Sequence, residues 1–446
     1  MSSDIRFRII FLILLILSHP SVQTRIIVAQ AKRVLREIEY YATKSFDILL
    51  ATLSRRVEVS KLEQQKNLLK KYVDVFTISP VTLDPVGVIK RLEHLVDTHE
   101  NYLRRAAKRI VGVDDKNVIN IISGIFVGVN AVRSLYKFLR HLIVSASKSG
   151  SLLIAYQIQV IMPFIRSLSM AYYDAVKAFS IASTIGDSAG PYVARLLARE
   201  IGAEFEVSDI DEQACVAKGE RNSREVYIIK ACGPAPNLCN FGRVVYELGS
   251  KLGEKLGGII TVDAALKLEG EETGSVQVGI GAAIGDPGHE KYKMETIAAE
   301  LKVPLMAVVI KQSLGEAIVP MAEAIARGSR KAKEEVFELI EEVIPEGKAV
   351  IVVGVGNTGG VAEGVSRDFE MPEPKIRVEL DPYLERKYTI RTRLENSEGK
   401  RIFRPFKPGD YVGKLVELDG EERIITEISA KIPKEISDIS LPLMFG

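Results

Sequence analysis

The sequence predicts an α/β protein in three parts: an N-terminal helical region with a membrane anchor, a three-layer α/β/α core on a mixed sheet, and a small C-terminal β appendage. Apolar residues recur at helical spacing over about the first 180 positions. Strand and helix patterns then alternate, and their Val- and Ile-rich strands are typical of a parallel or mixed sheet that is covered on both faces. Short, charged strand patterns follow to the end of the chain.

These patterns divide the chain into four segments. Residues 1–24 are the expected membrane anchor, 25–182 a helical domain, 183–370 an α/β domain and 371–446 a small β-rich domain. A chain of 446 residues with 47% hydrophobic content is long enough to bury more than one core.

The anchor is predicted from a wholly apolar run, Ile9 to Leu17. As a helix this run rises about 14 Å, half of a hydrocarbon core, and the residues up to Val22 bring it toward the thickness of a thin bilayer. No small-x-small cleavage site follows, and more basic residues follow the run than precede it. We therefore expect a membrane-anchored protein with cytoplasmic soluble domains. A soluble helix that is buried or packed in a hairpin is the alternative.

Helical patterns fill the next segment. We expect a long amphipathic helix over 23–71 and a second helix after Pro85. The apolar stretches "NVINIISGIFVGVNAV" and "SLLIAYQIQVIMPFIRSLSMAYYDAVKAF" lack an unbroken 18-residue apolar run, so they are predicted to be interior helices of a bundle. Pro163 should kink or interrupt the second of them.

The α/β domain is predicted from alternating segments. Helices are expected over 191–201, in "NFGRVVYELGSKLGEKLG", over 292–301 and twice within 316–343. The expected strands are "AEFEV", "REVYIIKACG", "GIITVDAAL", "GSVQVGIGAAIG", "PLMAVVIKQ" and "KAVIVVGVGNT". Functional side chains of such sheets lie at the carboxyl ends of the strands. In the final segment, Asp419 and Gly420 between apolar runs predict a hairpin.

The composition of the chain limits the partners and the cellular compartment that we expect. The 60 Lys and Arg residues nearly balance 58 Asp and Glu residues, so we expect no nucleic-acid partner. The three cysteines, Cys215, Cys232 and Cys239, are irregularly spaced, which argues against a disulfide framework and favours a reducing compartment. We expect them to be small buried thiols, because no histidine accompanies them at zinc-binding spacing.

Three polar residues form the candidate site. Asp187, in "STIGDSAGPYVARLL", lies in a Gly-rich turn at the start of a helix, and Asp263, in "IITVDAAL", ends a buried strand. His289, in "GAAIGDPGHE", follows another strand through a Gly-rich loop. Together they would form a divalent metal site, with zinc if the histidine is a ligand and magnesium if it is not. Taken singly, they are a helix cap, a strand-end hydrogen bonder and a surface histidine.

Two further Gly- and Pro-rich loops follow strands: "ACGPAPNLCNFGR" and "VGVGNTGGV". Neither ends in Gly-Lys-Ser/Thr or completes G-x-G-x-x-G, so nucleotide binding is not favoured. Their backbone amides would approach a substrate or an anion, and plain tight turns are the alternative. The residues expected in substrate-binding loops are Gly186, Gly190, Gly233, Asn237, Arg243, Gly356 and Asn357.

The region from about 183 to 320 resembles the hydrogenase-maturation endopeptidases and the spore germination proteases. "GDSAGPYVARLL" is similar to their D/E-x-x-G turn and "IITVDAAL" to their V-D-A strand end, which places the two acids on Asp187 and Asp263. The resemblance implies a phosphorylase/hydrolase-like fold and a metal held by both acids and His289. The G-x-G-N strand end of those families is not found ahead of Asp187, and "VVGVGNTGG" occurs instead near the end of the domain.

Nearly the whole chain also resembles an archaeal membrane-associated family of unknown function, through "SPVTLDPVGVIKRLEHLVD", "GDSAGP", "ACGPAPNLCNFGR" and "GVGNTGG". We therefore expect a membrane-anchored, metal-dependent, peptidase-like hydrolase that acts on a peptide or protein. An acid mechanism that uses the aspartates without metal is one alternative. A non-catalytic membrane scaffold, whose loops bind a peptide or small ligand, is another.

Overall fold

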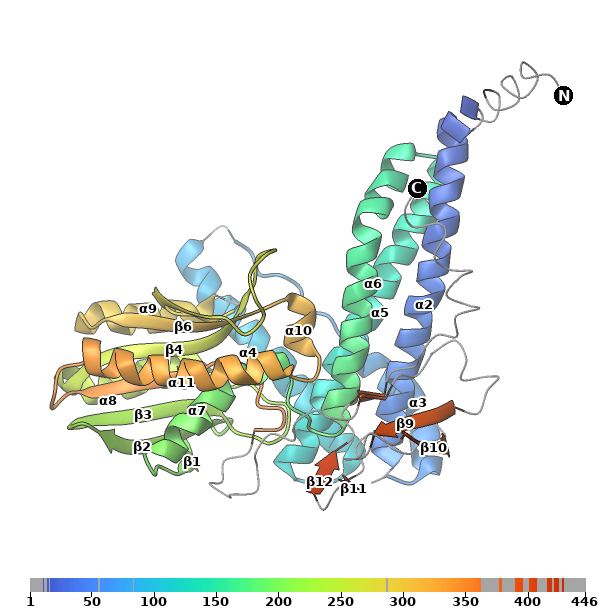
Figure 1. The fold of residues 1–446 in the computed structure, drawn as a ribbon. Coiled ribbons are helices and arrows are strands. Elements are labelled where there is room, and N and C mark those ends of the chain that lie inside the picture. The colour runs from blue at the N-terminus through green and yellow to red at the C-terminus, as the bar shows by residue number, and fades with distance from the viewer. Residues whose placement is uncertain are drawn as a thin grey trace. The chain divides into compact units, whose positions relative to one another are not determined.

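A computed structural model describes residues 11–361, except 12–13, 16, 55–56, 83 and 286–287, together with six short strands between 377 and 428 (Figure 1). The chain divides into two compact units, Met1–Lys177 and Ala178–Gly446, which are described separately below.

The first unit is helical, as expected. Its helices are α2 (Pro20–Ser54), α3 (Val59–Tyr72), α4 (Pro85–Val111), α5 (Lys116–Ser149) and α6 (Leu152–Ser180). The single helix expected over 23–71 is divided into α2 and α3. Pro163 lies inside α6, which continues to Ser180, so this proline does not interrupt the helix.

Side-chain caps and left-handed glycines set the helix ends in this unit. The Asp84 carboxylate accepts a hydrogen bond from the Gly87 amide (3.1 Å) at the start of α4, and Asp115 caps α5 in the same way. Gly112 and Gly150 end α4 and α5 with φ of +73° and +65°. The helices α2, α5 and α6 run side by side (Figure 1), and their shared core includes Ile38, Leu139, Ile143, Ile158 and Ile165.

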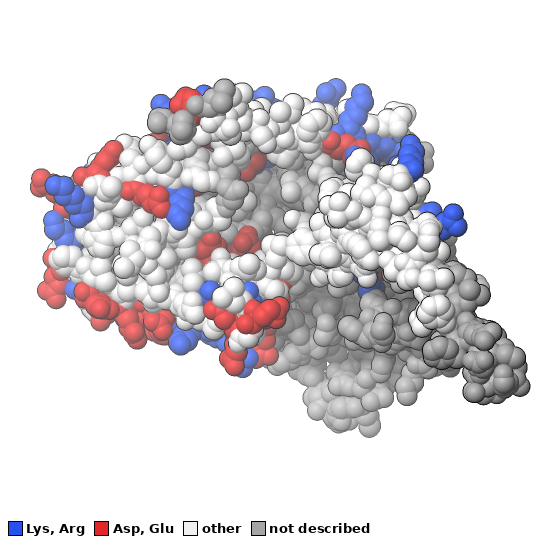
Figure 2. Space-filling model, turned by 90° about the horizontal axis from the view of Figure 1, so that it is seen from above, with Lys and Arg blue, Asp and Glu red and all other residues white. Residues whose placement is uncertain are grey.

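Two of the described helices, α5 and α6, are long and apolar enough to cross a membrane. Half of the apolar window of α5 is buried inside the protein, against 22% of that of α6. Exposed apolar side chains recur along one face of α6, at Leu153, Tyr156, Val160 and Phe164. Figure 2 looks onto the end of the bundle that carries the turn between α5 and α6, and this end is mostly uncharged.

The run expected to anchor the chain lies largely outside the described residues. Of its described residues, Phe11, Leu14, Leu15 and Leu17 have exposed side chains.

The second unit is built on one mixed sheet with strand order β1-β2-β3-β7-β4-β6-β5. The central pairs β3–β7, β7–β4 and β4–β6 are parallel, and the outer pairs are antiparallel. The strands are β1 (Phe205–Val207), β2 (Ala214–Arg221), β3 (Arg224–Ala231), β4 (Leu256–Leu266), β5 (Val276–Ile280), β6 (Leu305–Gln312) and β7 (Ala349–Gly354). The expected mixed sheet is confirmed.

Helices cover both faces of this sheet. They are α7 (Ala189–Glu200), α8 (Phe241–Leu252), α9 (His289–Leu301), α10 (Leu314–Ile318) and α11 (Glu323–Val343). Val193 of α7 and Ile340 of α11 share one core with Val262 of β4. On the other face, Val244 of α8 and Met294 of α9 share a core with Ile259 and Val353. The predicted three-layer arrangement is therefore present.

The hairpin of β2 and β3 departs from the expectations. No strand was predicted for β2, which pairs with β3 along its whole length and turns at Asn222 and Ser223, both with positive φ. This pairing brings Cys215 and Cys232 to a Cα–Cα distance of 5.1 Å, where they form a disulfide. The prediction of buried thiols is wrong for these two cysteines, because the sequence alone did not reveal the hairpin that brings them together.

The C-terminal segment contains short strand pairs, in keeping with its predicted β content. Strands β9 (Ile390–Glu395) and β10 (Arg401–Phe406) are antiparallel, as are β11 (Leu415–Leu418) and β12 (Glu421–Ile424). Strands β8 (Arg377–Val378) and β13 (Glu427–Ile428) are parallel. The hairpin residues Asp419 and Gly420 lie outside the described residues, between β11 and β12.

Gly190 holds α7 against the centre of the sheet. A Cβ at this position would lie 2.2 Å from the Val355 carbonyl oxygen and 2.4 Å from the Val262 carbonyl oxygen. Both contacts are backbone atoms and cannot rotate away. The start of α7 therefore touches β4 and the end of β7 only because residue 190 lacks a side chain.

We predict that Gly190→Ala lowers the free energy of unfolding of the α/β unit by about 1–3 kcal/mol, because the added methyl group overpacks this contact. Thermal unfolding measures the effect. Gly279→Ala is the matched control, since a Cβ at 279 meets open space. Equal melting temperatures for the two variants would show that the contact tolerates a side chain.

Candidate functional site

The carboxyl ends of β4 and β6 form a topological switch point in the sheet. The chain leaving β4 returns through the edge strand β5 to α9 on one face, whereas the chain leaving β6 continues into α11 on the opposite face. Connections that diverge in this way leave a crevice between neighbouring strands, which is where open α/β sheets bind ligands. Asp263 lies near the end of β4, and Gln312 ends β6.

Asp187 enters this region from the turn before α7. It lies in a short 3-10 helix, Gly186–Ser188, whose Gly186 amide donates to the Val319 carbonyl oxygen (3.0 Å). The Asp187 carboxylate accepts a hydrogen bond from the Asn357 amide (2.9 Å) after β7, and no side chain caps α7 at Ser188. A role as the cap of its own helix therefore does not explain Asp187.

The two predicted acids converge. Asp263 is buried, with 6% of its surface exposed, and accepts hydrogen bonds from the amides of Ala264 (2.7 Å) and Gly285. Burial and then the negative charge of Asp187 raise the pKa of Asp263 well above its ordinary value. Burial also raises the pKa of Asp187, against the opposing effect of the Asn357 amide. The charge of Asp187 thus disfavours the ionisation of Asp263.

Gln312 is a site residue that the sequence reasoning missed. Its side chain is 2% exposed, and among the described residues neither its amide nitrogen nor its amide oxygen has a hydrogen-bond partner. The amide oxygen lies 2.6 Å from the position that a Cβ on Gly186 would occupy, so this side chain adjoins the Asp187 turn. A buried amide without partners is costly, which suggests that a bound molecule completes its hydrogen bonds. No sequence motif surrounds this glutamine.

His289 lies elsewhere in the unit. It is the first residue of α9, is 2% exposed, and its Nε2 lies 2.9 Å from Oε1 of Glu290. Glu290 also accepts a hydrogen bond from the Gly242 amide at the start of α8. Within the described part of the chain, no three His, Cys, Asp or Glu side chains are grouped so that they could hold a metal ion. The metal centre of Asp187, Asp263 and His289 therefore stays a prediction, which no grouping of these three side chains supports.

Four of the predicted loop residues surround the acid pair. Gly186 adjoins Gln312, Gly190 contacts the carbonyl before Asp263, and the Asn357 amide binds Asp187. Gly356 has φ of +124°, and a Cβ there would lie 2.1 Å from the Asp187 carbonyl oxygen. The backbone of this loop therefore approaches the acid as closely as glycine permits.

The other predicted loop residues are Asn237, Gly233 and Arg243. The first two hold the neighbouring loops together, and Arg243 lies apart from the acids. The Asn237 side chain donates to the Cys232 carbonyl oxygen (3.0 Å), and its backbone carbonyl accepts from the Thr358 amide (3.1 Å). Gly233 leaves room for the Val361 carbonyl oxygen, so the loop after β3 packs on the loop after β7. Arg243 pairs with Glu247 on α8 (3.0 Å).

We predict that Asp263→Asn stabilises the protein near pH 7. A carboxyl group whose pKa is raised by folding loses stability as the pH rises from about 3.9, its unfolded value, toward its folded pKa. The amide removes this loss and still accepts the two backbone hydrogen bonds. The gain should therefore be present near pH 7 and should vanish near pH 4.

Thermal melts across this pH range measure the difference. The control is Asp209→Asn, at an aspartate whose side chain is 84% exposed. A variant that is less stable than the wild type near neutral pH would contradict the burial of an ionisable acid at position 263.

Two family profiles match successive parts of the chain. The profile of the "Protein of unknown function (DUF1512) N-terminal domain" matches residues 5–182, and that of the "Domain of unknown function (DUF1512) C-terminal" matches residues 185–362. No curated protein matches the chain. These matches support neither an archaeal origin nor the resemblance to hydrogenase-maturation endopeptidases. The chain belongs to the DUF1512 family, whose N- and C-terminal domains it carries in sequence.

Proposed function

We propose that the α/β unit is a hydrolase in which Asp187 and Asp263 act together as general acid and general base. The observation that carries this proposal is the pair itself: two carboxyl groups from distant parts of the chain meet at the switch point, and each has a raised pKa. Closely spaced carboxyl groups hold one proton between them, so one is an acid while the other is a base.

The chemistry follows from this shared proton. The ionised carboxylate removes a proton from water as its oxygen bonds to the carbonyl carbon of an amide. The protonated carboxyl group gives its proton to the amide nitrogen as the carbon–nitrogen bond breaks. The products are a carboxylic acid and an amine, and the pair again holds one proton, which now lies on the carboxyl group that acted as the base. The Gln312 amide nitrogen is available to donate to the substrate, since it has no partner in the described structure.

A peptide is the substrate class that we propose, on the basis of the "GDSAGP" and "VDAAL" resemblance. The divalent metal stays a separate prediction. Asp187 and Asp263 would each supply oxygen ligands to zinc or magnesium, and His289, which pairs with Glu290, would not join them. The reaction above needs no metal, so chelation tests this point.

We predict that the purified full chain cleaves peptides in a mixed library, read by mass spectrometry, and that Asp187→Asn and Asp263→Asn each lower the rate by at least about 100-fold. Each amide fills the space of the carboxylate but cannot serve as a base. The Asp209→Asn control should cleave at the wild-type rate.

Cleavage that survives both substitutions would refute the proposed role of the pair. A wild-type chain that binds peptides without cleaving them would support the scaffold alternative instead. If a chelator stops cleavage and added zinc or magnesium restores it, the metal-dependent form of the reaction is correct.

We also propose that the protein is membrane-associated, through the N-terminal apolar run and the exposed apolar face of α6, with the α/β unit in the cytoplasm. The exposed side chains of Leu153, Tyr156, Val160 and Phe164 support this role, as does the uncharged end of the bundle (Figure 2). An uncovered apolar helix face of this length is unfavourable in water.

We predict that Val160→Cys, made together with Cys239→Ser, resists a membrane-impermeant maleimide when the chain is bound to lipid vesicles and reacts fully after denaturation. Val160 is 82% exposed, so only an added partner can shield it. Val207→Cys is the control, at a 60% exposed site in β1, and should react in both states. Equal labelling of the two sites on vesicles would place α6 in water.

A further inference from the structure

A cavity of about 420 Å³ lies within the helical unit, between α2, α3 and α5. On the α2 side it is lined by three apolar residues together with Glu39, Thr43 and Asp47, and on the side of the other two helices by five cationic side chains and Tyr136. Its volume is within the range of about 300–1,000 Å³ that is usual for sites of small organic ligands. The acid pair of the α/β unit plays no part in it.

The cations form two rows. Lys66 and Lys70 are one turn apart on α3, and Arg133, Lys137 and Arg140 follow one face of α5 at helical spacing. Each helix therefore directs some of its positive charges toward the same cavity.

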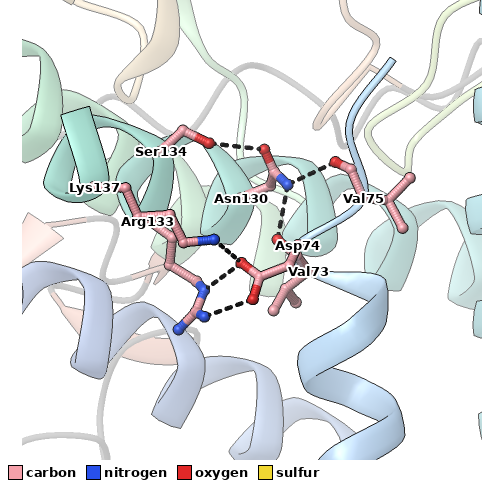
Figure 3. A network of polar contacts seen from close by, with 7 residues as sticks. All are labelled: Val73, Asp74, Val75, Asn130, Arg133, Ser134 and Lys137. Carbon is pink, nitrogen blue, oxygen red and sulfur yellow. Dashed lines mark hydrogen bonds and ion pairs between the residues drawn. The ribbon is translucent and has the colours of Figure 1, made fainter. Parts of the chain in front are cut away.

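An acid fixes part of the α5 row (Figure 3). Asp74 accepts from Nε (3.0 Å) and Nη2 (2.8 Å) of Arg133 and from Nζ of Lys137 (2.7 Å). These contacts lower the pKa of Asp74, so its charge is kept. Asn130 donates to the carbonyl oxygens of Val73 and Val75 (2.8 Å each) and ties the end of α3 to α5. The wall of the cavity is thus held in place without a ligand.

The remaining cations exceed the available acids. Two acids line the cavity: Glu39, which accepts from the Tyr136 hydroxyl (3.4 Å), and Asp47, which pairs with Lys44 (3.6 Å). In the part of the chain that the structure describes, Lys66, Lys70 and Arg140 form no ion pair. Three cations therefore face the cavity with their charge uncompensated by a paired acid.

The α2 wall is of a different kind. Ala42, Phe46 and Leu50 supply its apolar surface, one turn apart along the helix. A ligand with negative charge toward α3 and α5 and an apolar group against these three side chains of α2 would match both parts of the lining.

We propose that this cavity binds a soluble phosphate monoester that carries an apolar or aromatic group. A phosphate dianion matches several lysine and arginine donors. Inorganic phosphate alone would leave the apolar wall uncovered. A lipid headgroup is not favoured, because Glu39 lies about 30 Å along α2 from Leu17 of the apolar run.

Isothermal titration of the full chain with phenyl phosphate tests the proposal. We expect binding at least tenfold tighter than that of inorganic phosphate, weakened by salt. Lys70→Gln and Arg140→Gln should each weaken phenyl phosphate binding about tenfold, because each removes one charge from the site. The matched controls are Lys71→Gln and Lys148→Gln, exposed lysines on the same helices outside the cavity lining, which should bind as the wild type does.

Other outcomes would overturn the proposal. If phenyl phosphate binds no tighter than inorganic phosphate, the apolar side chains of α2 do not contribute to binding. Equal losses in the cavity variants and in their controls indicate a general charge effect. Binding to phosphatidic acid vesicles that depends on Lys70 and Arg140, without binding of phenyl phosphate, assigns the site to a lipid. Circular dichroism shows that each variant is folded.

Discussion

The candidate site depends on the contact between backbone and backbone at Gly190. There α7 touches the carbonyl groups of Val262 and Val355, so that the turn before the helix lies over the ends of β4 and β7. Gly356 continues the contact on the other side, against the carbonyl group of Asp187. Without these close approaches a layer of side chains would separate the two acids. With them, Asp187 and Asp263 are both buried, and the charge of Asp187 adds to the burial that raises the pKa of Asp263.

This arrangement works against stability, which is the reason to regard it as functional. Two carboxyl groups with raised pKa values cost folding free energy near neutral pH, because burial penalises their ionised forms. The buried amide of Gln312 adds a second cost, since its hydrogen-bonding groups have no partner in the described structure. A purely architectural sheet end would be more stable with apolar side chains. Polar groups that are buried, unpaired and gathered at a switch point are typical of ligand sites.

The sequence predicted the parts of this site that depend on the position of each residue along its own strand or helix. Asp263 was identified because it follows a buried strand, and Asp187 because it lies in a Gly-rich turn before a helix. His289 was also placed after a strand, but its ring pairs with Glu290 at the start of α9, a contact that linear spacing does not reveal. Gln312 was missed for the opposite reason: its environment is unusual, while its local sequence is not.

The same distinction applies to the fold. Alternating apolar patterns predicted the layers and the mixed sheet, since burial on both faces requires continuous Val and Ile runs. Strand β2 was missed because its first half is buried or half-buried without alternation, and its second half consists of charged residues and a glycine. The disulfide of Cys215 and Cys232 depends on that missed strand. Spacing along the chain could not predict it, because the bond joins the start of β2 to the residue that follows β3.

The positions of the charged residues distinguish α5 from α6, although both helices are apolar enough to cross a membrane. Arg133, Lys137 and Arg140 follow one face of α5. Three cations in hydrocarbon would cost about 2.5–3.5 kcal/mol each. The apolar residues of α5 instead pack inside the bundle, and its cations face a cavity on the other side. The packing of α5 is that of an interior helix of the bundle, whereas the exposed apolar face of α6 is the surface that the proposed membrane association uses.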